Sequence, residues 1–154
     1  MSATLNIGLI GSGFMGQAHA DAIRRAALLY PNLPKTPVLY AIADQNQAMA
    51  EQAARRFGAL HAYGDWREML QDPNIDVIDI TSPNHLHHQM ALEAIAAGKH
   101  VYCEKPLAVT EPQAREMAEA ARKAGVKTMV AFNNIKTPAA QLARQLIERG
   151  EIGT

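Results

Sequence analysis

Residues 5–16 read Leu5-Asn6-Ile7-Gly8-Leu9-Ile10-Gly11-Ser12-Gly13-Phe14-Met15-Gly16. The first six residues form a short apolar run that is typical of a buried strand. A helical pattern follows from Phe14 to about Leu29, with small and apolar residues recurring on one face. A G-x-G-x-x-G sequence therefore stands between a predicted strand and a predicted helix, the position in which such a loop binds phosphate groups.

Each glycine of this loop has a separate expected task. Gly11 permits the tight turn, Gly13 lets the backbone approach a pyrophosphate, and Gly16 lets the helix pack closely on the strand. The helix start adds free N–H groups and a partial positive charge of about half an elementary unit. A glycine-rich turn without a ligand and a SAM-binding methyltransferase loop remain alternatives, but the spacing of the third glycine favours a dinucleotide.

Outward from the loop, apolar runs alternate with helical patterns. The further predicted strands are residues 38–43, 60–62, 76–80, 99–103 and 127–132. The further predicted helices are residues 47–57, 65–70, 85–97, 111–124 and 138 to about 150, and residues 30–37 hold three prolines and are predicted to be a loop. Because crossovers between parallel strands are right-handed, we expect a three-layer, doubly wound α/β fold (Rossmann) of about six parallel strands in the order 3-2-1-4-5-6.

Composition limits the class of protein. The 154 residues suffice for one domain with its own core, and 15 basic residues balance 15 acidic ones. A chain without a basic field is not expected to bind nucleic acid. Cys103 is the single cysteine, which excludes an internal disulfide. No apolar run approaches the ~20 residues that span a bilayer, so we expect no membrane partner and a cytoplasmic location.

Asp44 ends the second predicted strand, where a carboxylate accepts hydrogen bonds from the ribose hydroxyls of a bound adenosine. A 2′-phosphate at that place would repel it by about 1 kcal/mol in water and about 4 kcal/mol at an intermediate dielectric. Neutral residues 45–47 follow, and the next cations are Arg55 and Arg56. We therefore expect NAD, with NADP less favoured. A plain helix N-cap is the alternative role of Asp44.

Five segments, in this order, resemble the Gfo/Idh/MocA oxidoreductases. They are residues 11–16, Asp44, residues 81–87 (Thr-Ser-Pro-Asn-His-Leu-His), residues 98–107 (Gly-Lys-His-Val-Tyr-Cys-Glu-Lys-Pro-Leu) and residues 150–153 (Gly-Glu-Ile-Gly). The resemblance covers essentially the whole chain, and the Glu104-Lys105-Pro106 signature is its most specific part. It implies an N-terminal NAD(P)-binding domain at residues 1–150. Residues 151–154 would then begin the linker to a C-terminal substrate domain that is absent.

The resemblance also implies a set of cofactor contacts, which group by part of the cofactor. At the pyrophosphate it places Gly11, Gly13, Phe14 and Met15, with Gly16 completing the loop. At the adenosine ribose it places Asp44. Near the middle of the cofactor and the nicotinamide ribose it places Thr81, Ser82, Pro83, Asn84 and His87. Beside the nicotinamide it places Glu104, Lys105 and Asn133. Asn134 and Lys136 depart from the aromatic or arginine residues that the family often has there.

Lys105 is the catalytic residue that the resemblance implies. Family members use this lysine near the reacting oxygen, with an Asp and a His from the second domain. A free lysine has a pKa near ~10.4 while proton transfer works best near ~7, a gap of about 4 kcal/mol that burial has to supply. Without the covering domain we expect Lys105 to be solvated, and the chain to bind NAD without efficient turnover. A surface lysine without a role is the alternative. As in relatives, Pro106 is expected to follow a cis bond.

The resemblance implies an NAD(P)-dependent dehydrogenase that acts, through its missing domain, on a sugar, polyol or similar hydroxyl-bearing substrate, and whose parent is a homo-oligomer. Two alternatives remain open. One is an NAD-dependent glycoside hydrolase or lyase that oxidises its sugar transiently, and the other is a non-catalytic NAD-sensing module. The residues that would decide among these lie in the missing domain.

Three other features favour structural roles. His85, His87 and His88 lack the further ligands that a zinc site needs, so no metal is expected. Tyr63 and Trp66 are expected to pack in the core in preference to contacting adenine. Cys103 is expected to be a buried structural cysteine, because no activating pattern surrounds it.

Overall fold

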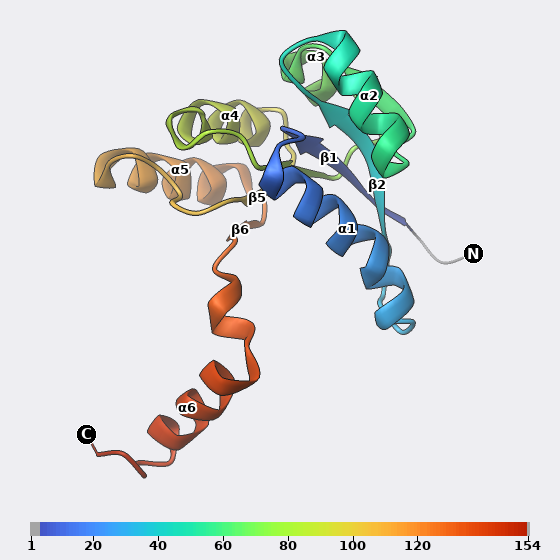
Figure 1. Cartoon of the computed structure of the whole chain (residues 1–154). Helices are drawn as coiled ribbons and strands as arrows, with labels where there is room; N and C mark the ends of the chain where they lie inside the picture. The colour runs from blue at the N-terminus through green and yellow to red at the C-terminus, as the bar shows by residue number, and fades with distance from the viewer. Residues whose placement is uncertain (1–3, 154) are drawn as a thin grey trace.

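A computed structural model describes residues 4–153 of the chain. Its single sheet has six parallel strands in the order β3-β2-β1-β4-β5-β6, which confirms the predicted topology (Figure 1). The strands are β1 (Thr4–Ile10), β2 (Thr36–Ala43), β3 (His61–Tyr63), β4 (Val77–Ile80), β5 (His100–Cys103) and β6 (Thr128–Val130). The helices are α1 (Phe14–Leu29), α2 (Gln47–Phe57), α3 (Trp66–Leu70), α4 (Asn84–Ala96), α5 (Glu111–Ala124) and α6 (Pro138–Glu148), with a 3-10 helix, η1 (Asn133–Lys136), before α6.

Helices cover both faces of the sheet, and each face has its own core. On one face α3, α4 and α5 pack over the strands, around Met69, Met90 and Met117. On the other face α1 and α2 pack over β1 and β2, where Ala20 and Ala53 let the two helices lie close to the sheet.

Local signals in the sequence explain where the helices begin and end. Asn46 caps α2, with its side chain accepting a hydrogen bond from the Met49 N–H at 3.0 Å. Asp65 caps α3 in the same way, as its position in the sequence predicts. Gly58 ends α2 with φ +75°, the left-handed conformation that glycine adopts without a Cβ penalty.

The structure corrects the predicted start of β2 and the predicted end of β6, and adds one short helix. Pro37 lies inside β2 and pairs with Leu5, although the loop was expected to include it. A proline is tolerated near the start of a strand, where its missing N–H costs little. β6 ends at Val130, and residues 133–136 form the unpredicted 3-10 helix η1. The expected long strand at residues 127–132 is therefore half strand and half connection.

The last helix stands apart from the rest. None of the residues of α6 is buried, and among the described elements its main packing partner is η1. Figure 1 shows η1 and α6 running away from the sheet. Within residues 4–153, no helix combines the length and apolar character needed to cross a membrane.

Candidate functional site

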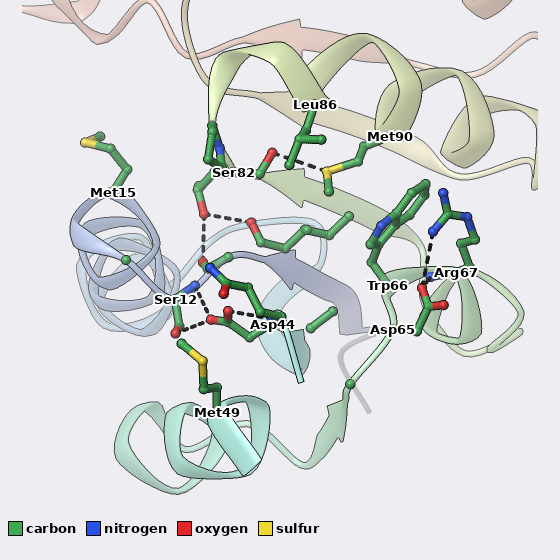
Figure 2. A pocket seen from close by; sticks show the side chains of 18 of the residues that line it. Ser12, Met15, Asp44, Met49, Asp65, Trp66, Arg67, Ser82, Leu86 and Met90 are labelled. Atoms are coloured by element: carbon green, nitrogen blue, oxygen red, sulfur yellow. Dashed lines mark hydrogen bonds and ion pairs between the residues drawn. The ribbon is translucent and has the colours of Figure 1, made fainter. Parts of the chain in front are cut away.

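The candidate site is a cleft of about 1060 Å³ at the carboxyl ends of β1, β2 and β4 (Figure 2). These strands meet where the strand order reverses, the usual ligand position in an open parallel sheet. The predicted residues that line the cleft are Gly11, Gly13, Phe14, Met15, Asp44, Thr81, Ser82 and Pro83. The predicted residues that do not line it are Gly16, Asn84, His87, Glu104, Lys105 and Asn133.

The glycine loop has the shape of a phosphate cradle. A Cβ at Gly16 would lie 2.0 Å from the Gly11 carbonyl oxygen, so α1 could not approach β1 with any other residue there. A Cβ at Gly13 would meet nothing within 4 Å, which leaves open space above the loop. No side chain caps the N-terminus of α1. Free N–H groups beside open space fit the pyrophosphate of a dinucleotide.

Asp44 is fixed at the edge of the cleft by three hydrogen bonds. Its Oδ2 accepts from the Ser12 N–H at 2.9 Å and from the Ser12 hydroxyl, and its Oδ1 accepts from the Gln45 N–H at 2.7 Å (Figure 2). The alternative role as N-cap of α2 is wrong, because Asn46 holds that position. The carboxylate is thus tied to the phosphate loop and faces the cleft.

The far wall of the cleft holds side chains whose contribution the sequence did not predict. Trp66 both packs on the core and lines the cleft, with the Arg67 guanidinium 4.3 Å above its ring. Arg67 is thus a cation at the cleft, and it pairs with Glu93 at 3.2 Å and Asp65 at 3.7 Å. From the sequence, Trp66 was expected mainly to pack in the core, and its place in the cleft wall comes from the structure.

Two expected packing residues have pKa values that reflect burial. Tyr63 donates its hydroxyl hydrogen bond to Asp72 at 3.0 Å, and burial together with that carboxylate raises the pKa of Tyr63 to about 12. Burial, with Asp79 and Glu104 nearby, raises the pKa of the Cys103 thiol to about 12 as well. Cys103 is 1% exposed, so the prediction that this cysteine is buried is confirmed.

His87 lies behind the cleft wall and does not line the cleft. Its ring is fully buried, with Nδ1 2.9 Å from the Pro106 carbonyl oxygen and Nε2 2.9 Å from the Ser82 carbonyl oxygen. Ser82 lines the cleft, and Pro106 belongs to the turn after β5. His87 therefore joins the cleft wall to that turn.

The turn after β5 carries the Glu104-Lys105-Pro106 signature. The Lys105–Pro106 bond is cis and Lys105 is exposed, both as expected. Glu104 is buried, and its Oε2 accepts a hydrogen bond from the Lys105 N–H at 2.9 Å. The Glu104 side chain thus points into the protein, while the lysine stays free at the carboxyl end of the sheet. Asn133 is exposed at the start of η1.

Two residues that were not predicted from the sequence form a bonded chain with Glu104, in which His19 bonds with Glu104 and Asp79 bonds with His19. His19 of α1 lies between Glu104 and Asp79 of β4. One signal was available, because Asp79 interrupts an otherwise apolar strand, Val-Ile-Asp-Ile. A carboxylate in such a strand needs a buried partner.

The histidines at the start of α4 do not converge on a metal position. His88 lies 2.8 Å from Glu116 on α5, and His85 is exposed. Across residues 4–153, no group of three or more His, Cys, Asp or Glu side chains could hold a metal ion.

Comparison with known proteins agrees with this site. Residues 5–132 match a family model described as an oxidoreductase family with an NAD-binding Rossmann fold. The chain belongs to the Gfo/Idh/MocA oxidoreductase family. This Gfo/Idh/MocA domain is 47% identical over 149 residues to the levoglucosan dehydrogenase of Pseudarthrobacter phenanthrenivorans, covering 97% of this chain and 38% of that protein.

Solved structures extend the comparison. An NAD binding oxidoreductase from Klebsiella pneumoniae superimposes with a TM-score of 0.95 at 76% identity, over 99% of this chain and 40% of that one. A levoglucosan dehydrogenase in complex with NADH and levoglucosan gives a TM-score of 0.93 at 47% identity, over 97% of this chain and 40% of that one. The Gfo/Idh/MocA domain described here thus spans about 40% of the length of these relatives.

Proposed function

We propose that this chain is the cofactor-binding part of an NAD-dependent dehydrogenase that oxidises a hydroxyl group of a sugar or polyol. The observation that carries the proposal is the Ser12–Asp44 arrangement beside the glycine cradle, which offers one site for pyrophosphate and one for a ribose diol. The sugar or polyol class is supported by the relatives, among them the levoglucosan dehydrogenase and a myo-inositol 2-dehydrogenase of Thermotoga maritima at 30% identity.

Residues of this chain divide the work at the cofactor. The α1 N-terminus and Gly13 receive the pyrophosphate, and Asp44 accepts hydrogen bonds from the ribose hydroxyls. Residues 81–83 and Trp66 form walls of the cleft that would flank the bound cofactor. When bound, NAD supplies the hydride acceptor. In its neutral form, the amine of Lys105 at the carboxyl end of β5 would take the proton from the substrate hydroxyl.

We also propose that residues 1–150 form the cofactor domain and that residues 151–154 lead into a substrate domain. The support is an apolar surface on α6 and on the segments flanking it, which no described residue covers. Large apolar side chains there are more than half exposed, namely Phe132, Ile135, Leu142, Ile147 and Ile152. Relatives are more than twice as long, which leaves room for a domain on this surface. With Lys105 exposed, the isolated chain binds NAD and turns over poorly.

Calorimetric titration of the purified chain with NAD and NADP tests the cofactor assignment. We expect saturable NAD binding and weaker NADP binding, because a 2′-phosphate would face Asp44. In Asp44→Ala, the loss of charge-assisted hydrogen bonds of about 1.5–3 kcal/mol should weaken NAD binding by roughly tenfold or more and narrow the difference from NADP.

The matched control is Asp21→Ala. Asp21 is an exposed carboxylate of α1 that, among the described residues, pairs with Arg25 at 3.0 Å and does not line the cleft, so its removal should leave both affinities unchanged. If the chain binds neither cofactor, or binds NAD equally well without the Asp44 carboxylate, the assignment of the cleft is wrong. Steady NADH production from a sugar by the isolated chain, abolished in Lys105→Ala, would contradict the expectation of poor turnover.

A further inference from the structure

A buried polar cluster connects α1 with the turn that carries Lys105. The Nδ1 of His19 lies 3.0 and 2.9 Å from the two carboxylate oxygens of Asp79, and its Nε2 lies 3.2 Å from Oε1 of Glu104. Asp79 is 2% exposed and Glu104 is 6% exposed. Tyr102 of β5 stacks on the His19 ring, with centroids 5.5 Å apart. The two carboxylates occupy opposite sides of the imidazole, so the three side chains cannot converge on one metal ion.

Stability of the fold does not account for this cluster. Asp79 lies between Ile78 and Ile80 in a central strand. An apolar residue at this position would avoid the free-energy cost of removing a carboxylate from water. Replacement of buried ion pairs by apolar residues of similar volume is commonly neutral or stabilising. A role in placing other groups is the better explanation for two buried carboxylates bonded to a partly buried histidine.

The electrostatics favour a protonated histidine. Burial lowers the pKa of His19, but the hydrogen bonds and charges of Asp79 and Glu104 outweigh burial and raise that pKa above its ordinary value. Both ring nitrogens then donate, one to each carboxylate. The imidazolium thus holds the Glu104 side chain in one position.

The chain of bonds continues from Glu104 to Lys105. The second carboxylate oxygen of Glu104 accepts the Lys105 N–H at 2.9 Å. His19 lies in the second turn of α1, the helix whose N-terminus faces the cofactor cleft. The helix at the pyrophosphate end and the turn that bears the lysine are therefore joined through one imidazole.

We propose that His19, held by Asp79, is a positioning residue that fixes Glu104 and, through it, the Lys105 turn relative to bound NAD. This inference rests on the proposed role of Lys105. His19 acts through Glu104 and not on the substrate, because both of its ring nitrogens are engaged and its side chain is 12% exposed. Without the imidazole, the lysine keeps its chemistry and loses its fixed place.

The test follows the Lys105 side chain by NMR in the 154-residue chain with isotope-labelled lysine, using Lys105→Arg to identify its signal. We expect saturating NAD to shift the Lys105 signal in the wild-type chain. In His19→Ala that shift should fall by at least about half, because the turn is no longer held in one position. The NAD dissociation constant should stay within about threefold, since the cleft residues are intact.

The matched control is His88→Ala, which removes another histidine–glutamate pair, the one at 2.8 Å on the surface between α4 and α5. It should leave the Lys105 shift unchanged. His19→Gln, whose amide can donate to one carboxylate, should recover part of the shift. An undiminished shift in His19→Ala overturns this inference and leaves the proposed function standing. If the Lys105 signal of the wild-type chain does not shift when NAD is added, the proposed role of Lys105 is overturned, and this inference with it.

A second measurement needs no variant and applies if His19→Ala does not fold. The Lys105 backbone amide signal, which reports its bond to Glu104, should change with pH at the same midpoint as the His19 ring signals. Three titratable side chains face His19, namely Asp79, Glu104 and Tyr102. Because these groups can also titrate, the midpoint for His19 is taken from its own ring signals. A Lys105 amide that shows no step at this midpoint overturns the inference.

Discussion

At the scale of single residues, two glycines of the phosphate loop differ in what surrounds their α-carbons. Gly16→Ala would drive a Cβ to within 2.0 Å of the Gly11 carbonyl oxygen, a backbone atom that cannot move aside without separating α1 from β1. We expect a loss of at least about 2 kcal/mol in the free energy of unfolding, measured by urea denaturation. NAD binding should be lost together with the loop geometry.

Gly13→Ala is the informative counterpart. A methyl group there meets nothing within 4 Å, so the free energy of unfolding should change by less than about 1 kcal/mol. It would nevertheless occupy the space proposed for the pyrophosphate, and NAD binding should weaken by roughly tenfold. Equal destabilisation by both substitutions would contradict this division between a packing glycine and a ligand-facing glycine.

Residues of the candidate site could be predicted where their position depends on the neighbouring sequence alone. Asp44 and the glycines follow directly from strand-end and loop position. His19 and Asp79 do not, because their contact joins positions 60 residues apart that only the packing of α1 on the sheet brings together. For His87, the resemblance implied a place beside the cofactor, but the α4 pattern could not tell a cleft-facing side chain from one buried against Pro106 and Ser82.

At the scale of elements, the sequence predicted every helix and strand of the described chain except η1. The amphipathic pattern of residues 138–148 predicted helix α6 but not the surface that packs against it, because a periodic apolar face indicates only that the face is normally covered. Strand β6 was predicted to end two residues too late, because Ala131 and Phe132 continue the apolar run after the pairing with β5 ends at Val130. Ala131 still donates its N–H to the Cys103 carbonyl at 2.8 Å.

The isolated position of α6 leads to a prediction about truncation. Removal of residues 137–154 deletes no buried side chain of the described structure, so the free energy of unfolding should change by less than about 0.5 kcal/mol. NAD affinity should also be kept. Further removal of residues 127–136 would strip β6 from β5 and expose a new sheet edge, which should destabilise the chain and promote aggregation. A large fall in melting temperature on the shorter deletion would show that α6 packs on the body of the domain.

At the scale of the whole molecule, stability should depend on pH through the His19 cluster. A group whose pKa is raised on folding contributes stability that is complete below its unfolded pKa and is lost as pH rises through its folded pKa. For His19 the unfolded value is about 6.5, so the loss begins above that pH. Burial, and secondarily the Glu104 charge, also raises the pKa of Asp79, which acts in the same sense from about pH 3.9 upward.

Urea denaturation between pH 6 and 8 measures this dependence. Measurements stop at pH 8 so that Cys103 does not contribute to the change in stability. The pKa of Cys103 is raised to about 12, and its effect on the free energy of unfolding begins only near its unfolded pKa of about 8.5. The wild-type free energy of unfolding should fall with rising pH, by up to about 1.4 kcal/mol for each unit by which the His19 pKa is raised. In His19→Gln the slope should flatten, because no imidazole remains to release its proton, whereas His88→Ala should keep the wild-type slope. An unchanged slope in His19→Gln would mean that other groups control stability in this range and that the imidazole carries no extra proton in the folded chain.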